Sequence, residues 1–212
     1  MDGFALGFQG FAVGHLAVNA YNLGAYWTHV GPTDWYTDAV VMGSSLVIDP
    51  TSGDGIGPTT HGNAFYTSLE GGALFPLTPT IDIEPQAQLI WQRTRINDLN
   101  DGISTVSSHS DGSLIGRIGA RMQGKFERAG ALWRPYFRAN LWRYFGGTDS
   151  QTYAATTVIA ASASATAAEF ALGLATTFSA CGSAFVNVSY TANVGGATRS
   201  IVTGNAGVRV RW

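Results

Sequence analysis

The side chains that most often carry catalysis or hold metal ions are scattered in this chain. His15, His29, His61 and His109 lie far apart, without an i, i+4 pair or a His-Glu-x-x-His motif, so they offer no zinc site. The Gly-x-Ser-x-Gly elbow of a serine hydrolase is absent from the sequence. The glycine-rich stretch 53–57 lies in a long polar segment and opens no helix, which argues against phosphate binding. We therefore expect no enzyme activity and no catalytic, cofactor-binding or metal-binding residues.

Arginine and acidic residues are the better candidates, because they recur at alternate positions within apolar segments. In segment 80–92 (TIDIEPQAQLIWQ), for example, Asp82 and Glu84 alternate with apolar residues. The planar guanidinium of arginine pairs well with carboxylates in enclosed spaces. The charges that we expect to share one enclosed face are Asp38, Glu70, Asp82, Glu84, Arg117, Arg121, Arg134, Arg138 and Glu169. They either satisfy one another or contact a segment held inside that face.

The elements that carry these charges are β-strands, because polar and apolar residues alternate with period two in segment after segment. A strand directs successive side chains to opposite faces, so each of these segments has one apolar and one polar surface. The pattern predicts strands at 20–30, 35–47, 61–75, 80–96, 112–127, 131–145, 165–179, 184–193 and 199–212, with a further strand at 4–12. Several are longer than the 5–6 residues usual in globular sheets and suit a tilted strand that crosses a bilayer.

Composition excludes several classes of protein. Of the 212 residues 45% are hydrophobic and only 12% charged, and the formal net charge is −2, so disorder and nucleic-acid binding are not expected. No apolar run approaches the 20 or so residues of a transmembrane helix. The single cysteine, Cys181, excludes an internal disulfide framework. A large soluble β-protein and an outer-membrane β-barrel remain.

The connections between the predicted strands favour the barrel. Short turns at 31–34, 76–79, 128–130 and 180–183 alternate with long polar segments at 48–60, 97–111 and 146–164. Outer-membrane barrels have short periplasmic turns and long extracellular loops, so this alternation places the C-terminus in the periplasm. Aromatic residues cluster near the strand ends, as the interfacial girdles of such barrels do; we assign Trp27, Trp35, Trp133 and Phe145 to these girdles.

The polar faces also favour the barrel over a soluble β-sandwich. Lysine is common on the outside of soluble sheets, whereas Lys125 is the only lysine of this chain. Arginine, glutamine, asparagine and acids suit a narrow lumen, and the opposite faces suit lipid. We therefore predict an all-β, antiparallel, up-and-down transmembrane β-barrel, with a soluble β-sandwich binding module as the alternative.

Specific segments resemble a known family. The stretches 21–41 (YNLGAYWTHVGPTDWYTDAVV), 83–92 (IEPQAQLIWQ), 116–126 (GRIGARMQGKF) and 132–149 (LWRPYFRANLWRYFGGTD) are similar to the C-terminal translocator domain of classical autotransporters, the type V secretion proteins. The final run GNAGVRVRW resembles the terminal strand of that family. The similar stretches extend over about residues 20–212.

The resemblance implies a Gram-negative outer-membrane barrel of twelve strands, with surrounding lipid and a helical segment threading the pore. That segment would join the barrel to an N-terminal passenger exported to the cell surface. The β-barrel assembly machinery would recognise the last strand, here through Gly207, Val208, Val210 and Trp212. In some branches of the family a lumenal acid assists passenger cleavage, but the linker asparagine that this reaction needs is not in the chain. An outer-membrane pore without a passenger is the alternative.

The whole chain, 1–212, is expected to be one barrel domain that is incomplete at its N-terminus. Nine to ten of the twelve strands can be counted, with residues 1–18 as the remnant of an earlier strand and its outer loop. An open sheet edge leaves backbone groups unsatisfied in lipid, so we expect the 212 residues to be part of a longer polypeptide.

Overall fold

The computed structural model contains β-strands joined by turns and loops. It describes residues 2–8, 11–53, 55, 57–100, 102, 105–179, 181–195 and 200–210. The strands are β1 (Asp2–Phe8), β2 (Phe11–Val30), β3 (Trp35–Ser52), β4 (Thr60–Ala73), β5 (Phe75–Thr78), β6 (Ile81–Ile96), β7 (Leu99–Asn100), β8 (Thr105–Ser110), β9 (Ser113–Gly124), β10 (Phe126–Arg128), β11 (Ala131–Tyr153), β12 (Thr157–Thr177), β13 (Gly182–Gly195) and β14 (Ser200–Val210). In the part of the chain that the structure describes, no helix is long and apolar enough to cross a membrane.

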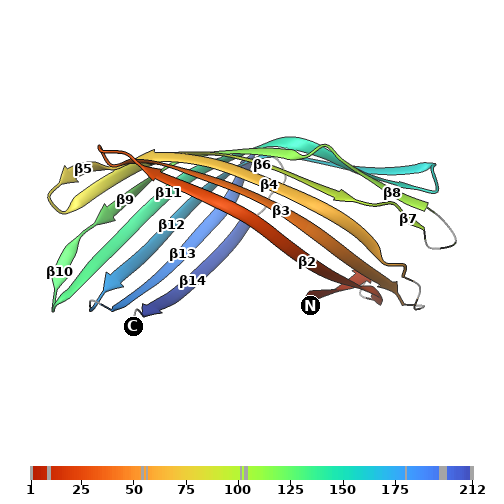
Figure 1. Cartoon of the computed structure of the whole chain (residues 1–212), viewed down its shortest axis with the longest axis horizontal. Coiled ribbons are helices and arrows are strands. Elements are labelled where there is room, and N and C mark those ends of the chain that lie inside the picture. The colour runs from red at the N-terminus through yellow and green to blue at the C-terminus, as the bar shows by residue number, and fades with distance from the viewer. Residues whose placement is uncertain are drawn as a thin grey trace.

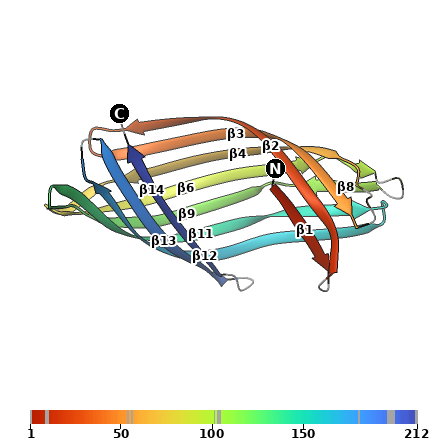
Figure 2. The ribbon, with the colours of Figure 1, turned by 90° about the horizontal axis from the view of Figure 1, so that it is seen from below.

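All these strands belong to one antiparallel sheet that follows the order of the chain. Its main path is β1-β2-β3-β4-β6-β9-β11-β12-β13-β14, and β5, β7, β8 and β10 are short additions to it. The sheet curls strongly, so that it arches over a hollow (Figures 1 and 2). Within the described residues β1 and β14 are the two edges of this path. The prediction of an all-β, up-and-down antiparallel architecture with nine to ten main strands is confirmed.

Burial in this sheet is the reverse of that in a soluble protein. Among the described residues, the buried hydrophobic side chains are Ile90, Ile115, Ala167 and Ala171, whereas Asp82, Arg117 and Asn140 are among the buried polar ones. Large apolar residues such as Leu23, Leu172 and Val208 are 84%, 60% and 72% exposed. A soluble sandwich must bury its apolar face against a second layer, and no second sheet covers this one among the described residues. The soluble alternative is therefore wrong, and the apolar face is suited to lipid.

The short connections form as the sequence indicates. At the turn between β10 and β11, Ala129 and Gly130 both have positive φ values, 55° and 73°, which is the requirement of a two-residue type I′ hairpin turn. Asp34, with φ of 56°, has the same conformation in the turn between β2 and β3, where the amide of Gly31 donates to the carbonyl of Trp35 over 2.7 Å. Both turns lie at the same end of the sheet, because the intervening strands alternate in direction.

The long connections differ from the prediction. Segments 97–111 and 146–164 were expected to be polar loops, but they contain β7 and β8, the end of β11 and the start of β12. The end of β11 pairs with β8, from Asp149 opposite Ser110 to Tyr153 opposite Val106. The apolar alternation used for prediction is weak in these Ser- and Thr-rich stretches, so it misses strands that extend beyond the membrane-facing part.

The N-terminal segment also differs from the prediction. Residues 1–18 were expected to be the remnant of an earlier strand and its outer loop, with a strand at 4–12, but the chain forms a hairpin of β1 and β2 there. Strand β2 begins at Phe11 and remains paired with β3 from Gly14 to Val30. Residues 14–20 are mostly small or apolar at both odd and even positions, so the sequence there does not distinguish the two faces of the strand.

Candidate functional site

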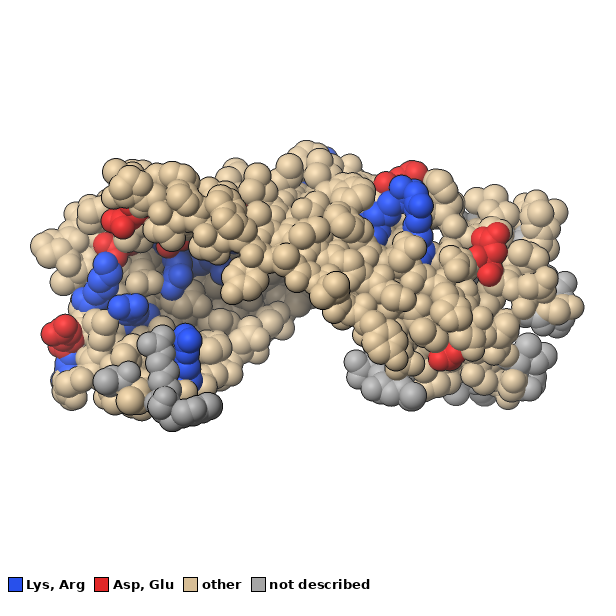
Figure 3. Space-filling model, viewed as in Figure 1, with Lys and Arg blue, Asp and Glu red and all other residues tan. Residues whose placement is uncertain are grey.

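The predicted charges lie on one face of the sheet, as the cross-strand register shows. Residues directly opposite each other share a face, and one row of such pairs runs from Asp38 to Glu70, then Gln88, then Arg117. A neighbouring row joins Glu84, Arg121 and Arg138. Hydrogen bonds on this face connect strands that are not neighbours, because long side chains extend across the strand between them. Lysine, arginine and acidic side chains are visible inside the hollow in Figure 3.

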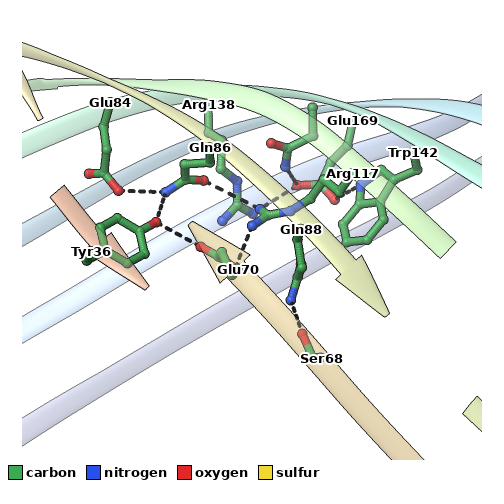
Figure 4. A network of polar contacts seen from close by, with 11 residues as sticks. Tyr36, Ser68, Glu70, Glu84, Gln86, Gln88, Arg117, Arg138, Trp142 and Glu169 are labelled. Carbon is green, nitrogen blue, oxygen red and sulfur yellow. Dashed lines mark hydrogen bonds and ion pairs between the residues drawn. The ribbon is translucent and has the colours of Figure 1, made fainter. Parts of the chain in front are cut away.

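Glu70 is the centre of the first group of polar contacts on the concave face (Figure 4). Its carboxylate accepts a 2.7 Å charged hydrogen bond from Arg117 Nη2 and a 2.8 Å hydrogen bond from the hydroxyl of Tyr36. The Gln86 amide then donates to Tyr36 Oη over 3.0 Å and to Glu84 over 2.7 Å. The Arg117 side chain is 7% exposed and that of Glu70 20%, so this ion pair is shielded from solvent.

Glu169 is the centre of a second group (Figure 4). One carboxylate oxygen accepts hydrogen bonds from Arg138 Nη2 at 2.9 Å and from the Asn140 amide at 3.0 Å. The other accepts from the indole N–H of Trp142 at 3.1 Å. The guanidinium of Arg117 lies 5.4 Å from the centre of the Trp142 ring, a cation–π distance that links the two groups. We call the two groups together the concave polar belt.

The other predicted charges have different partners. Asp82 is 7% exposed and pairs with Lys125 at 2.6 Å. The Arg121 guanidinium lies over the ring of Tyr136 at 4.3 Å. Arg134 is exposed on β11, and the strand register places it on the same face as the other charges.

The Asp38 carboxylate is half-buried, and its Oδ1 atom has no hydrogen-bond partner among the described residues. It faces Glu70 directly across the strand pair, and two carboxylates so placed repel each other. The sequence pattern places Asp38 on the charged face but gives no partner for it.

Sequence reasoning missed several members of this face. Tyr36 was not among the predicted site residues, but it points into the hollow, and its position two residues before Asp38 was the signal for this. Asn140 and Trp142 share the Glu169 carboxylate and lie two and four residues beyond Arg138 on the same strand face. Alternation alone indicates their face but not the shared partner.

The predicted girdle aromatics lie at exposed positions of the outer face. Trp27, Trp35, Trp133 and Phe145 are 57%, 38%, 38% and 57% exposed. His29 links the first two, with its ring centre 5.8 Å from that of Trp27 and 5.1 Å from that of Trp35. Phe145 lies at the other end of the membrane-facing part of β11, against Gly116. The placement suits two girdles, one near each end of the strands.

The proposed assembly signal lies on the edge strand β14. Val208 and Val210 are 72% and 61% exposed on the outer face. Gly207 is on the opposite face, where its backbone lies directly beneath the ring of Phe185. Trp212 lies outside the described residues.

The described residues contain no group of three His, Cys, Asp or Glu side chains placed to hold a metal ion. At the end of β8, His109 contacts Asp111 at 2.9 Å, and both side chains are more than half exposed. The arrangement of the charged face is therefore one of ion pairs and hydrogen bonds.

Comparison with known proteins agrees with the fold. The family model described as "Autotransporter beta-domain" matches residues 6–189. Two solved structures share the fold. The beta domain of the Bordetella autotransporter BrkA superposes with a TM-score of 0.68 and 20% identity, and the match covers 96% of this chain and 76% of the BrkA chain. The transport unit of the autotransporter AIDA-I from Escherichia coli superposes with a TM-score of 0.77 and 15% identity, and the match covers 94% of this chain and 68% of the AIDA-I chain.

One curated relative is also similar in sequence. The adhesin BmaC autotransporter of Brucella suis biovar 1 (strain 1330) is 30% identical over 113 residues, which are 51% of this chain and 3% of that protein. The chain thus corresponds to a very small part of that relative's length. It belongs to the autotransporter β-domain family. The prediction of an outer-membrane translocator domain for a passenger is confirmed at this level, and such a domain has a transport rather than a catalytic role.

Proposed function

We propose that the concave polar belt lines the passage through which the passenger segment of this autotransporter crosses the outer membrane. The observation that carries the proposal is that the belt's large polar side chains bond to one another along the wall. Glu70 and Glu169 each accept hydrogen bonds from at least two side chains. A wall whose charges are already paired presents polar groups to a passing chain without holding it by uncompensated charge.

The proposed orientation has the C-terminus in the periplasm. Its support is the asymmetry between the two ends of the sheet. Two-residue and four-residue turns such as 129–130 and 31–34 lie at one end, whereas the extended hairpin of β11 and β12, with β8 beside it, lies at the other. Outer-membrane barrels have their short turns on the periplasmic side. The same orientation would offer β14 to the β-barrel assembly machinery, which we propose as the partner in assembly.

Photo-crosslinking on the two faces of β13 tests the proposed passage. Ser189 lies on the concave face, opposite Ala171 of β12, and its neighbour Val188 is 49% exposed on the outer face. A photoreactive residue at position 189 of the full-length protein should crosslink to the protein's own N-terminal segment during export. The same residue at position 188 should not, because it faces lipid.

The matched positions make the result decisive. Both variants alter one residue of the same strand, so a general assembly defect would affect them alike. Equal crosslinking from positions 188 and 189, or none from 189 in protein that reaches the outer membrane, would contradict the proposal.

A further inference from the structure

The outer face of the sheet has an apolar groove across strands β4, β6, β9 and β11. Its floor consists of the small residues Gly71 and Ala87, the ring of Phe145 lies over a third small residue, Gly116, and the volume of the groove is about 500 Å³. Larger apolar side chains border it, including Leu89 and Ile118, which are 50% and 61% exposed. The register joins these residues directly, since Gly71 lies opposite Ala87 and Leu89 opposite Gly116.

The groove slopes through the membrane-facing zone. Arg143 lies at the end of the groove farther from the short turns, twelve residues beyond Ala131, where β11 begins, and Ala87 on its floor lies six residues beyond Ile81, where β6 begins. A strand that rises about 3.3 Å per residue and tilts by about 40° gains roughly 2.5 Å per residue along the barrel axis. On that basis Ala87 lies about 15 Å and Arg143 about 30 Å from the end with the short turns. The groove therefore descends from Arg143 toward the middle of the apolar band.

Arg143 is the charged residue of this groove on the outer face. The register places it opposite Gly116 and Thr166, between the outward-facing Leu141 and Phe145. Its Nη1 atom donates to the Thr166 hydroxyl over 2.8 Å, and no acidic side chain contacts it among the described residues. A cation on the lipid face is unfavourable within the hydrocarbon zone and tolerated near the interface, where phosphate groups can neutralise it.

We propose that this groove is a binding site for one phosphorylated glycolipid of the lipid A type from the outer leaflet of the outer membrane. The phosphate would accept charged hydrogen bonds from Arg143, and an acyl chain would lie along the floor of Gly71 and Ala87. The proposal rests on the proposed orientation, which places Arg143 at the outer leaflet. Charge complementarity identifies the head group, and continuity with the lipid-facing surface identifies the chain.

Two substitutions separate the head-group and chain contacts. Arg143→Gln removes the charge, and Arg128→Gln on β10, at the opposite end of the sheet, is its matched control. Gly71→Val fills the floor without a clash, because an added Cβ would meet only the Tyr36 carbonyl at 3.6 Å. Gly43→Val is the control, since Gly43 lies on the outer face of β3 with nothing within 4 Å of an added Cβ.

The experiment is native mass spectrometry of the full-length protein, extracted from outer membranes and delipidated in mild detergent, with lipid A added. Dephosphorylated lipid A and phosphatidylglycerol serve as comparison probes. Wild-type protein should retain lipid A at least about tenfold more strongly than its dephosphorylated form, the effect expected of a charge-assisted hydrogen bond. Arg143→Gln and Gly71→Val should each reduce lipid A retention to a similar extent, while both controls should match the wild type.

Several results would refute the proposed lipid A site. Retention by Arg143→Gln and Gly71→Val equal to that of the wild type would do so, as would equal retention of the dephosphorylated lipid. Phosphatidylglycerol held as strongly as lipid A would refute the choice of an outer-leaflet glycolipid. Wild-type protein that inserts and exports its passenger but retains no lipid A would refute this site alone. Wild-type protein that fails to reach the outer membrane would refute the proposed function itself.

Discussion

Replacing Glu169 by glutamine should destabilise the folded barrel, because this carboxylate serves three donors at once. Glutamine keeps one acceptor oxygen for Arg138 and Asn140, but its NH₂ group then faces the indole N–H of Trp142. An unsatisfied buried donor costs about 1–3 kcal/mol. Arg138 is 34% exposed, so loss of its ionic partner adds only about 1 kcal/mol after allowance for solvent screening. The expected destabilisation is about 2–4 kcal/mol.

Heat-modifiable migration on gels measures this loss in the protein as it is extracted from outer membranes. In a domain of 150–250 residues a loss of 1 kcal/mol lowers the unfolding midpoint by about 2–4 °C. The Glu169→Gln variant should therefore unfold roughly 5–15 °C below the wild type. Glu127→Gln is the matched control, because Glu127 is an exposed carboxylate on β10.

A double-mutant cycle identifies the source of the change. Arg138→Gln should lower the midpoint in the wild type but should have a smaller effect when Glu169 is already glutamine, because the pair is then already broken. If Glu169→Gln and Glu127→Gln unfold at the same temperature, the second group of the concave polar belt does not stabilise the barrel and the reasoning is refuted.

Four further results are expected. Arg117→Gln should lower the same midpoint by a similar amount, since it leaves a shielded carboxylate without its cation, and Arg117→Lys should recover only part of the loss. Gly119→Ala should also lower it, because the added Cβ would lie 2.6 Å from a carbonyl oxygen of the next strand, whereas Gly43→Ala should leave it unchanged or raise it slightly. Trp212→Glu should reduce the amount of protein in outer-membrane fractions, and an unchanged amount would contradict the terminal assembly signal. A membrane-impermeant maleimide should label the exposed Cys181 only after the outer membrane is opened; labelling in intact cells would contradict the proposed orientation.

Period-two alternation predicted the strands of the membrane-facing part well, because there the two faces meet different surroundings. Strand β6 was expected at 80–96 and occurs at Ile81–Ile96, in a segment where almost every position contrasts with its neighbours. Strands β11 and β12 run far beyond the predicted ends at 145 and 165. Those extensions are Ser-, Thr- and Ala-rich and pair through backbone hydrogen bonds. Backbone pairing does not depend on hydrophobic side chains, so the hydrophobic pattern does not reveal these strands.

The partners within the charged face could not be predicted from alternation. Alternation fixes the face on which a side chain lies, but the partner depends on register and on the curvature of the sheet. Glu70 and Arg117 lie on β4 and β9, which are separated by β6, and the long Arg117 side chain reaches across β6 to the Glu70 carboxylate at 2.7 Å. Lys125, just beyond β9, reaches Asp82 because Ile81 pairs with Gly124, a register that the sequence does not specify.

On the concave face, large aromatic side chains lie directly opposite glycines of the neighbouring strand. Tyr36 lies opposite Gly72, Tyr136 opposite Gly173 and Phe185 opposite Gly207, and in each pair a Cβ on the glycine would collide with the ring. The ring can therefore lie flat over the neighbouring strand instead of standing upright in the hollow. This posture carries the hydroxyl of Tyr36 across β4 to the Gln86 amide of β6. The glycines of the concave face thus let side chains bond across strands and let bulky rings lie against the wall.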